Sequence, residues 1–427
     1  MKKIKPAWPI LLALPMLLCA ACQKNEEPAP FHFVMGTSDY PASVPALPQK
    51  CAGVQDPDFF TAIRRISDKS DGYSGPGIEN QYATVDPENC DGTLAVLRAN
   101  SGGWFLYNPS TCQMIKEVIT DWSQESEPIW DPANPRLFYY VWNTKLRSYD
   151  VDTDETATIH DFKREFPGSA FIDTHSYGTP SLDRRYWCLM VKDSSWNVLS
   201  VIIYDRTLDA VIGRKSGGFP DEVRGSSMDM SGRHCVVNFE NITYAQAYSR
   251  DFSIRTDLPD GSNGHNDLAV MKDGRDVLVY QNVRTDFISI ADLNTGAETR
   301  LLPIPFDVNS DIGLHFSGNA GVTPGWVLIS TYGAKNPPPG ERHSWMDCQL
   351  FMLELKADPR IWRIAHTHSY ISESYSSEKN YFAEAFAAIT SRGTRVYWGS
   401  NWGSFVQDYT ETFQLTLPEN WAALMPK

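Results

Sequence analysis

The feature that most constrains this chain is a repeat of turn and strand segments. Seven times a turn rich in Asp, Gly, Ser or Pro leads into a hydrophobic run, and these runs start near Leu94, Leu137, Tyr186, His234, Asp276, Trp326 and Val396. Most of the starts lie about 40–50 residues apart, and a further strand-like phrase follows most of the runs. Four-stranded units at this spacing are typical of propeller blades. The sequence therefore predicts an all-β fold, a seven-bladed β-propeller.

The two ends of the repeat predict how the ring closes. The segment 58–71 has the character of an outer strand without a blade of its own, and the last strand phrase, at 412–418, has no successor. We expect residues near 58–67 to complete the seventh blade, so that residues 58–427 form one propeller domain. A jelly roll or double sandwich is the competing all-β fold, but it does not predict seven similar units.

Composition and charge narrow the classes of partner. Aromatic residues make up 12% of the chain, which suits strands, and the formal net charge is −14. An acidic surface argues against nucleic acid or an anionic bilayer as the main partner. The chain has no Gly-rich phosphate loop and no GxSxG motif, so nucleotide use and serine-type hydrolysis receive no support.

The N-terminal residues have the pattern of an export signal. Three lysines precede an uncharged run from Ala7 to Ala21, which is too short to span a membrane as a helix. We interpret residues 1–21 as a signal peptide and residues 22–57 as a polar tether and N-terminal extension. The sequence LCAAC resembles the lipidation site of bacterial lipoproteins, with Cys22 as the acylated residue. In that class Gln23 after the cysteine implies the outer membrane of a Gram-negative cell envelope, and ordinary cleavage to a soluble secreted protein is the alternative.

Export would place the remaining cysteines in an oxidising compartment. The segment from Cys90 to Cys112 is predicted to be a hairpin that turns at residues 100–103, which places these two cysteines opposite each other. We therefore predict a Cys90–Cys112 disulfide. Cys188 and Cys235 lie within apolar strand runs and are interpreted as free buried thiols, while Cys51 and Cys348 are left unassigned.

Aligning the blades on their second strands groups several titratable residues. About 10–12 residues before each strand start, where the innermost strand should begin beside the channel, stand Glu127, His175, Arg224, His265, His315 and Glu384. In the first blade the candidates at this place are Glu79, Asn80 and Gln81. The chain has only 9 His, and three of them fall at these positions. We expect one ligand site at a mouth of the channel, the alternative being that each residue caps its own strand.

A second pattern is a His-x-His pair. His366 and His368 are separated by one residue, so on a strand both rings point to the same side. Two imidazoles at this spacing can share a divalent metal ion. The alternative is a polar strand face exposed to solvent.

These residues together resemble known families. The turn and strand units resemble the TolB and WD40-like propellers of bacterial envelopes, and the His-lined mouth is similar to the propeller polysaccharide lyases, above all the oligogalacturonate lyases. The resemblance covers most of residues 58–416. It implies that His265 is the catalytic base and Arg224 its cationic partner, and it implies a set of divalent metal ligands: His315, His366 and His368. The family has a Gln ligand three residues before the His pair, where this chain has Arg363, which cannot coordinate a cation.

Two classes of function are therefore open. The first is a metal-dependent lyase that cleaves an acidic polysaccharide or oligosaccharide, with Glu127, His175 and Glu384 in contact with the substrate. In such an elimination a neutral imidazole takes the proton beside a uronate carboxylate while a cation stabilises the developing charge. The second is a non-catalytic propeller that binds a glycan or an envelope protein.

Overall fold

The computed structural model describes residues 31–40, 45–73, 75–118, 126–175, 178–306, 312–333, 344–372, 376–403 and 410–426. The chain divides into two compact units, residues 1–32 and Phe33–Lys427. The predicted signal peptide and the predicted lipidation site Cys22 lie outside the described residues. Within the described ranges, no helix has the length and hydrophobicity needed to cross a bilayer.

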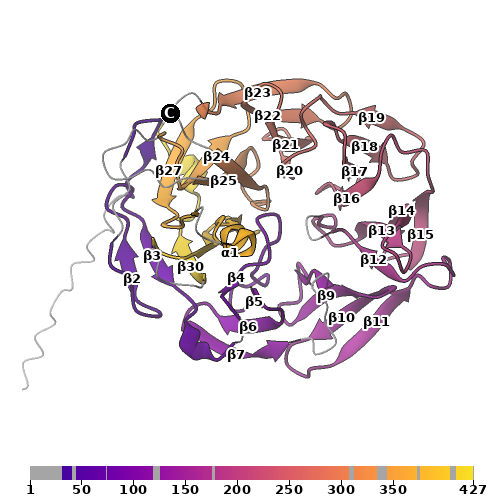
Figure 1. The fold of residues 1–427 in the computed structure, drawn as a ribbon, viewed down its shortest axis with the longest axis horizontal. Helices are drawn as coiled ribbons and strands as arrows, with labels where there is room; N and C mark the ends of the chain where they lie inside the picture. The colour runs from indigo at the N-terminus through magenta and orange to yellow at the C-terminus, as the bar shows by residue number, and fades with distance from the viewer. Residues whose placement is uncertain are drawn as a thin grey trace, which may run out of the picture. The chain divides into compact units, whose positions relative to one another are not determined.

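The second unit consists of seven antiparallel sheets arranged around a central channel (Figure 1). In six of the sheets four strands follow one another both in the sequence and in the sheet, and in the sheet of blade seven three strands do so. Blades one to three contain β4 (Ile78–Glu79), β5 (Ala95–Ala99), β6 (Trp104–Asn108), β7 (Gln113–Val118), β8 (Ile129–Trp130), β9 (Leu137–Trp142), β10 (Lys145–Asp150), β11 (Thr156–Asp161), β12 (Phe171–Asp173), β13 (Tyr186–Lys192), β14 (Val198–Asp205) and β15 (Ala210–Lys215).

Blades four to seven follow the same order. Their strands are β16 (Val223–Met228), β17 (His234–Phe239), β18 (Gln246–Ser249), β19 (Arg255–Asp257), β20 (Asn266–Val270), β21 (Asp276–Asn282), β22 (Phe287–Asp292), β23 (Glu298–Pro303), β24 (Ile312–Ser317), β25 (Trp326–Gly333), β26 (Gln349–Glu354), β27 (Ile361–His366), β28 (Ala388–Ile389), β29 (Arg395–Ser400) and β30 (Glu411–Thr416). The described helices are short: η1 (Lys69–Asp71), α1 (Ser377–Phe382) and α2 (Trp421–Leu424). The predicted all-β, seven-bladed propeller is confirmed, and each second strand begins within one residue of its expected start.

Strands from the N-terminal part of the second unit extend the last two blades. β3 (Ala62–Arg65) pairs with β30, with Ile63 opposite Leu415, and β2 (Gly53–Gln55) pairs with β3. The seventh blade thus combines strands from both ends of the propeller. β1 (Val34–Met35) pairs with β27 and adds a fifth strand to blade six.

Apolar side chains fill the space between neighbouring blades. Blades five and six share one large cluster, which includes Val279, Leu314 and Phe351. The largest fully buried side chains include four tryptophans: Trp104, Trp362, Trp398 and Trp421. Burying a large apolar side chain contributes about 1.5–3 kcal/mol, so these interfaces hold the blades in fixed positions around the channel.

The predicted Cys90–Cys112 disulfide is wrong. Cys112 bonds to Cys51, and Cys90 is free. The second strand of blade one, β5, starts only at Ala95. The side chain of Asn89 accepts hydrogen bonds from the backbone of Thr93 and Leu94 and folds the preceding residues into a turn. Cys90 belongs to this turn and does not extend the hairpin.

The interpretation of two other cysteines as free thiols is also wrong. Cys188 and Cys235 lie on β13 and β17, the second strands of blades three and four, and form a disulfide with their Cα atoms 5.8 Å apart. Their strands lie in adjacent blades, so the bond joins one blade to the next. Cys348 is a buried free thiol.

Candidate functional site

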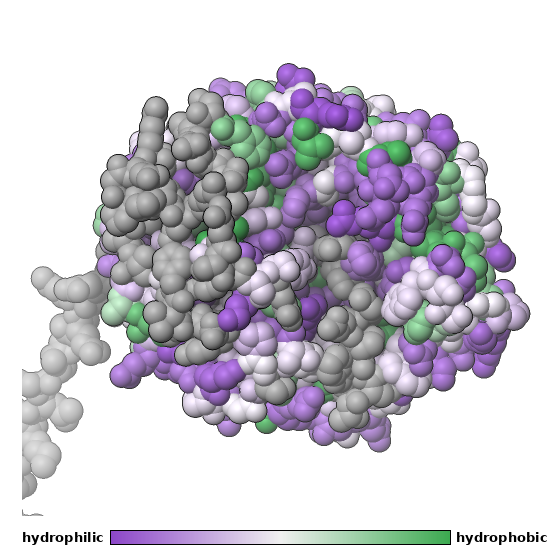
Figure 2. Space-filling view, in the orientation of Figure 1, coloured by the Kyte–Doolittle hydropathy of each residue, from purple (hydrophilic) through white to green (hydrophobic). Residues whose placement is uncertain are grey.

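A cavity of about 300 Å³ opens beside the channel. Hydrophilic side chains gather around the middle of the face seen in Figure 2. The residues that line the cavity come from blades four to seven and from the loop after β4: Tyr82, Arg224, Gly225, Asn238, Asn263, Gly264, His265, Asn266, His315, Tyr332, Tyr381 and Glu384. Four of the six residues predicted by blade alignment, Arg224, His265, His315 and Glu384, therefore lie together.

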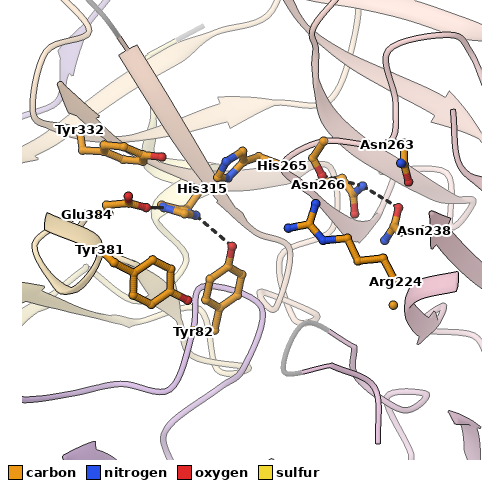
Figure 3. Close-up of a pocket in the computed structure, with 12 residues that line it drawn as sticks. Tyr82, Arg224, Asn238, Asn263, His265, Asn266, His315, Tyr332, Tyr381 and Glu384 are labelled. Atoms are coloured by element: carbon orange, nitrogen blue, oxygen red, sulfur yellow. Dashed lines mark hydrogen bonds and ion pairs between the residues drawn. The ribbon is translucent and has the colours of Figure 1, made fainter. Parts of the chain in front are cut away.

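The first three of these residues come from equivalent places in consecutive blades. Arg224 is the second residue of β16, His265 directly precedes β20, and His315 lies on β24. The carbonyl of His265 accepts a hydrogen bond from the backbone of Gln281, which fixes this residue to the next strand of its blade. Glu384 follows α1, in the segment that leads into β28. In Figure 3 the guanidinium of Arg224 and the rings of His265, His315 and Tyr82 face one another across the cavity.

A glycine makes room for one wall of the cavity. A Cβ atom at Gly313 would lie only 2.1 Å from the ring of Tyr332. Because this space is left empty, the Tyr332 ring stacks on the imidazole of His315, with centroids 5.2 Å apart and an interplanar angle of 20°. The ring of Phe386 contacts another side of His315. His315 is consequently buried and held in one orientation.

Both ring nitrogens of His315 have polar partners. Nδ1 lies 3.3 Å from the hydroxyl of Tyr82, and Nε2 lies 3.3 Å from Oε2 of Glu384. Burial lowers the pKa of His315 to about 3. Burial also raises the pKa of Glu384 to about 7, against the opposing effects of His265 and Tyr332. Near neutral pH this hydrogen-bonded chain can therefore hold a proton on the carboxyl group of Glu384 beside a neutral imidazole.

His265 is the second imidazole of the cavity. Its Nδ1 atom is buried and has no hydrogen-bond partner among the described residues, although the residue as a whole is partly exposed. Burial lowers the pKa of His265 to about 3, and His315 and Arg224 act in the same direction, while Glu384 opposes them. The imidazole is thus neutral at physiological pH and able to accept a proton or a ligand.

Sequence reasoning missed the aromatic and amide side chains of the cavity. Asn238 and Tyr332 stand at or near the ends of β17 and β25, and Tyr381 lies on α1. Asn266 donates a hydrogen bond to the side chain of Asn238 at 3.0 Å. No local pattern separates these residues from other Tyr and Asn residues of the chain, so only the three-dimensional arrangement identifies them.

Two of the predicted residues do not line the cavity. Glu127 accepts hydrogen bonds from the backbone and hydroxyl of Thr174, so its carboxylate joins blade two to blade three. His175 follows the end of β12 and is likewise absent from the lining. The blade-one candidate Glu79 lies on β4, where its side chain is buried against Gly399.

The His-x-His pair lies in a different part of the propeller. His366 is the last residue of β27, and its ring packs on Phe59. Potential ligand atoms of His366, Asp56 and Asp58 all lie within 4.8 Å of one another, which is close enough to hold a metal ion. No local pattern in the sequence identifies the two aspartates as partners of this pair.

The metal ligand set implied by the resemblance does not converge. His315 pairs with Ser330, Ser330 with Leu350, and Leu350 with Ala365, the neighbour of His366. His315 and His366 are therefore separated by three strand spacings, roughly 14 Å. Arg363 replaces the fourth ligand and donates hydrogen bonds to Trp345 and Gln349 instead. These residues do not fit one metal ion beside the cavity.

Comparison with known proteins supports the fold. No family model matches the chain, and no curated protein matches it. Among solved structures, the chain is similar to an oligogalacturonate lyase in complex with manganese, with a TM-score of 0.59 and 14% sequence identity. The match covers 88% of this chain and 98% of that chain. At this identity the likeness shows that the two chains share the propeller fold.

Proposed function

We propose that the central cavity is the active site of a lyase that cleaves uronate-containing oligosaccharides or polysaccharides by β-elimination. The observation that carries the proposal is the imidazole of His265, which its surroundings keep neutral, in a cavity that also contains Arg224 and Glu384. The fold shared with a solved oligogalacturonate lyase agrees with this activity.

The reaction assigns one role to each of these side chains. Arg224 binds the uronate carboxylate and stabilises the negative charge that develops on it. His265 takes the proton from the carbon next to the carboxylate. The electron pair of the broken C–H bond forms a carbon–carbon double bond, and the bond to the glycosidic oxygen breaks. Glu384, whose pKa of about 7 leaves about half of the carboxyl groups protonated in neutral solution, gives its proton to the leaving oxygen.

The remaining lining residues suit a sugar. Tyr82, Tyr332 and Tyr381 offer aromatic faces and hydroxyl groups, and the amides of Asn238 and Asn266 offer donors and acceptors. A cavity with few apolar aliphatic side chains and one guanidinium favours a polar, anionic ligand even though the chain as a whole is acidic.

The test is a panel of uronate-containing glycans incubated with the full chain, followed by the ultraviolet absorbance of the unsaturated product. We expect wild-type protein to generate this absorbance and His265→Ala to lose at least about 100-fold in rate, because the proton acceptor is missing. His160→Gln is the matched control, since His160 lies on β11 and pairs with Asp209 rather than with the cavity. A complete panel without any gain in absorbance refutes the lyase.

A non-catalytic glycan-binding propeller is the second candidate. The observation that favours it is the aromatic and amide lining, which would bind a sugar without any chemistry. In this case calorimetry detects binding of a glycan that yields no unsaturated product, and Tyr381→Ala weakens that binding while the ring fold is retained.

We also propose that the protein is exported and anchored by a lipid on Cys22 to the outer membrane of a Gram-negative cell envelope. The two disulfides support export, since such bonds form and persist in oxidising compartments. In that place the enzyme would meet glycans outside the cytoplasm.

A further inference from the structure

We propose that Asp56, Asp58, His366 and His368 bind a divalent first-row transition cation of the zinc or manganese class. This cation site is separate from the central cavity. It joins the hairpin of β2 and β3, which lies in blade seven, to β27, the last strand of blade six. It does not depend on the reaction proposed above.

The site is formed by two segments that are far apart in the sequence. Asp56 and Asp58 lie in the turn between β2 and β3, the two N-terminal strands added to blade seven. His366 ends β27 of blade six, and the backbone carbonyl of His368 accepts a hydrogen bond from Gly403, which follows β29 in blade seven. The four side chains therefore meet at the boundary between blades six and seven.

The two aspartates lie close to the two histidine rings. Nδ1 of His366 lies 3.2 Å from Oδ2 of Asp56, and its Nε2 lies 3.8 Å from Oδ2 of Asp58. Nε2 of His368 lies 4.0 Å from the same Oδ2 atom of Asp56. Ligands that bind one ion at about 2.0–2.2 Å in tetrahedral geometry stand about 3.4 Å apart. One imidazole gives one nitrogen to an ion, so His366 would bind through either Nδ1 or Nε2. With one ligand atom taken from each residue, the ligand atoms of His366, Asp56 and Asp58 lie within 4.8 Å of one another.

His368 is the independent observation that points to a ligand. Its side chain is 0% exposed, yet neither of its ring nitrogens has a hydrogen-bond partner among the described residues. The ring is held in this place by Trp402, whose centroid lies 4.4 Å away. A buried imidazole without polar partners is costly, and a bound cation would satisfy one of its nitrogens.

The surroundings are compatible with a cation. Nε2 of His366 also lies 3.4 Å from the carbonyl oxygen of Tyr40, which is a further oxygen donor facing the site. The guanidinium of Arg363 interacts with both aspartates but is directed by hydrogen bonds to Ser38, Trp345 and Gln349. Two carboxylates and one guanidinium leave one negative charge to attract a cation. The combination of imidazole nitrogens and carboxylate oxygens selects zinc, manganese or iron over calcium and magnesium.

The test measures bound metal on the full chain. The purified protein is stripped with a chelator, dialysed against zinc chloride or manganese chloride, freed of excess ion and analysed by mass spectrometry of the metal. We expect one equivalent of zinc or manganese, and an increase in Tm of about 3 °C or more when the ion is present at one hundred times its Kd. His368→Ala should lose the ion, and Asp58→Asn should weaken its binding by more than about tenfold.

The control variant is His315→Gln, which changes the central cavity and should retain the full equivalent of metal. Asp58 is partly exposed and accepts no hydrogen bond that holds the fold, so Asp58→Asn gives a result even if His368→Ala does not fold. The proposal is overturned if the wild type binds neither ion, if both site variants keep it, or if His315→Gln loses it. A protein that binds the ion but cleaves no glycan refutes the lyase and leaves this site standing.

Discussion

Replacing Arg65 with methionine should destabilise the propeller at the place where it closes. Arg65 ends β3, and its guanidinium forms ion pairs with Glu411 on β30 and with Asp68. The two partners on β3 and β30 are almost fully buried, with side-chain exposures of 8% and 2%. Among the described residues, the carboxylate of Glu411 in Arg65→Met keeps only the backbone N–H of Lys69 as a hydrogen-bond donor. Breaking such a buried pair by removing one partner costs about 3–5 kcal/mol.

The loss should depend on pH in a defined direction. Burial raises the pKa of Glu411 in the folded protein, and Arg65 opposes this rise. Without Arg65 the pKa of Glu411 in the folded protein rises further above its value in the unfolded chain. Between these two pKa values the folded state holds a proton on Glu411 that the unfolded state releases. The resulting loss of stability is full above the raised pKa and shrinks as the pH falls below it. We expect the deficit of Arg65→Met to be larger at pH 8 than at pH 5.

The assay is urea unfolding of the full chain with its disulfides intact, at both pH values. Arg64→Met is the matched control, because Arg64 is the neighbouring residue on β3 and, within the described part of the chain, donates hydrogen bonds only to the backbone carbonyls of Cys51, Pro109 and Ser110. It should cost about 1–2 kcal/mol and show no comparable pH dependence. The double variant Arg65→Met/Glu411→Leu should recover most of the lost stability. If the free energy of unfolding of Arg65→Met lies within about 1 kcal/mol of the wild-type value at both pH values, the reasoning is refuted.

Three further predictions concern the cavity, the cysteines and the anchor. If Glu384 donates a proton, kcat should fall roughly tenfold per pH unit above about pH 7, because the raised pKa of Glu384 is about 7. Glu384→Gln should remove this decline at high pH, and a wild-type kcat that stays constant from about pH 6 to 9 would contradict the role. Peptide mapping without reduction should yield Cys51–Cys112 and Cys188–Cys235 linked peptides, and a Cys90–Cys112 peptide would show that the pairing is wrong. Cys22→Ser should abolish partitioning into detergent, and unchanged partitioning would exclude the lipid anchor.

The blade repeat was predictable because its signal is local. Each second strand follows a tight turn of Asp, Gly, Ser or Pro and is strongly apolar, so Tyr186 and Asp276 could be identified as strand starts from neighbouring residues alone. Locating the innermost strand by counting 10–12 residues back from each second strand was less reliable. The loop between the first and second strands of a blade varies in length. In blade three β12 already ends at Asp173, so His175 falls beyond it, whereas Arg224 and His315 lie within their strands.

The remaining contacts join residues that no local pattern connects. Cys51 is 61 residues from Cys112, and Asp56 is 310 residues from His366. The short spacing of His366 and His368 is visible in the sequence, but the contacts of this pair with Asp56 and Asp58 depend on how the N-terminal segment passes from blade six to blade seven. Such pairings follow from the closure of the ring and not from the sequence around either residue.

The pairing of β3 with β30 also sets an order of events during synthesis. Arg65 and its partner Glu411 are 346 residues apart, which corresponds to roughly 20–70 s of translation at 5–20 residues per second. Throughout this interval β3 has made no ladder with β30, and its unpaired backbone groups can join strands of other chains. Contacts of such long sequence separation also slow folding once the chain is complete. The edge of β3 that later pairs with β30 is therefore open during synthesis, and overexpression should produce aggregates in which this strand is paired between molecules.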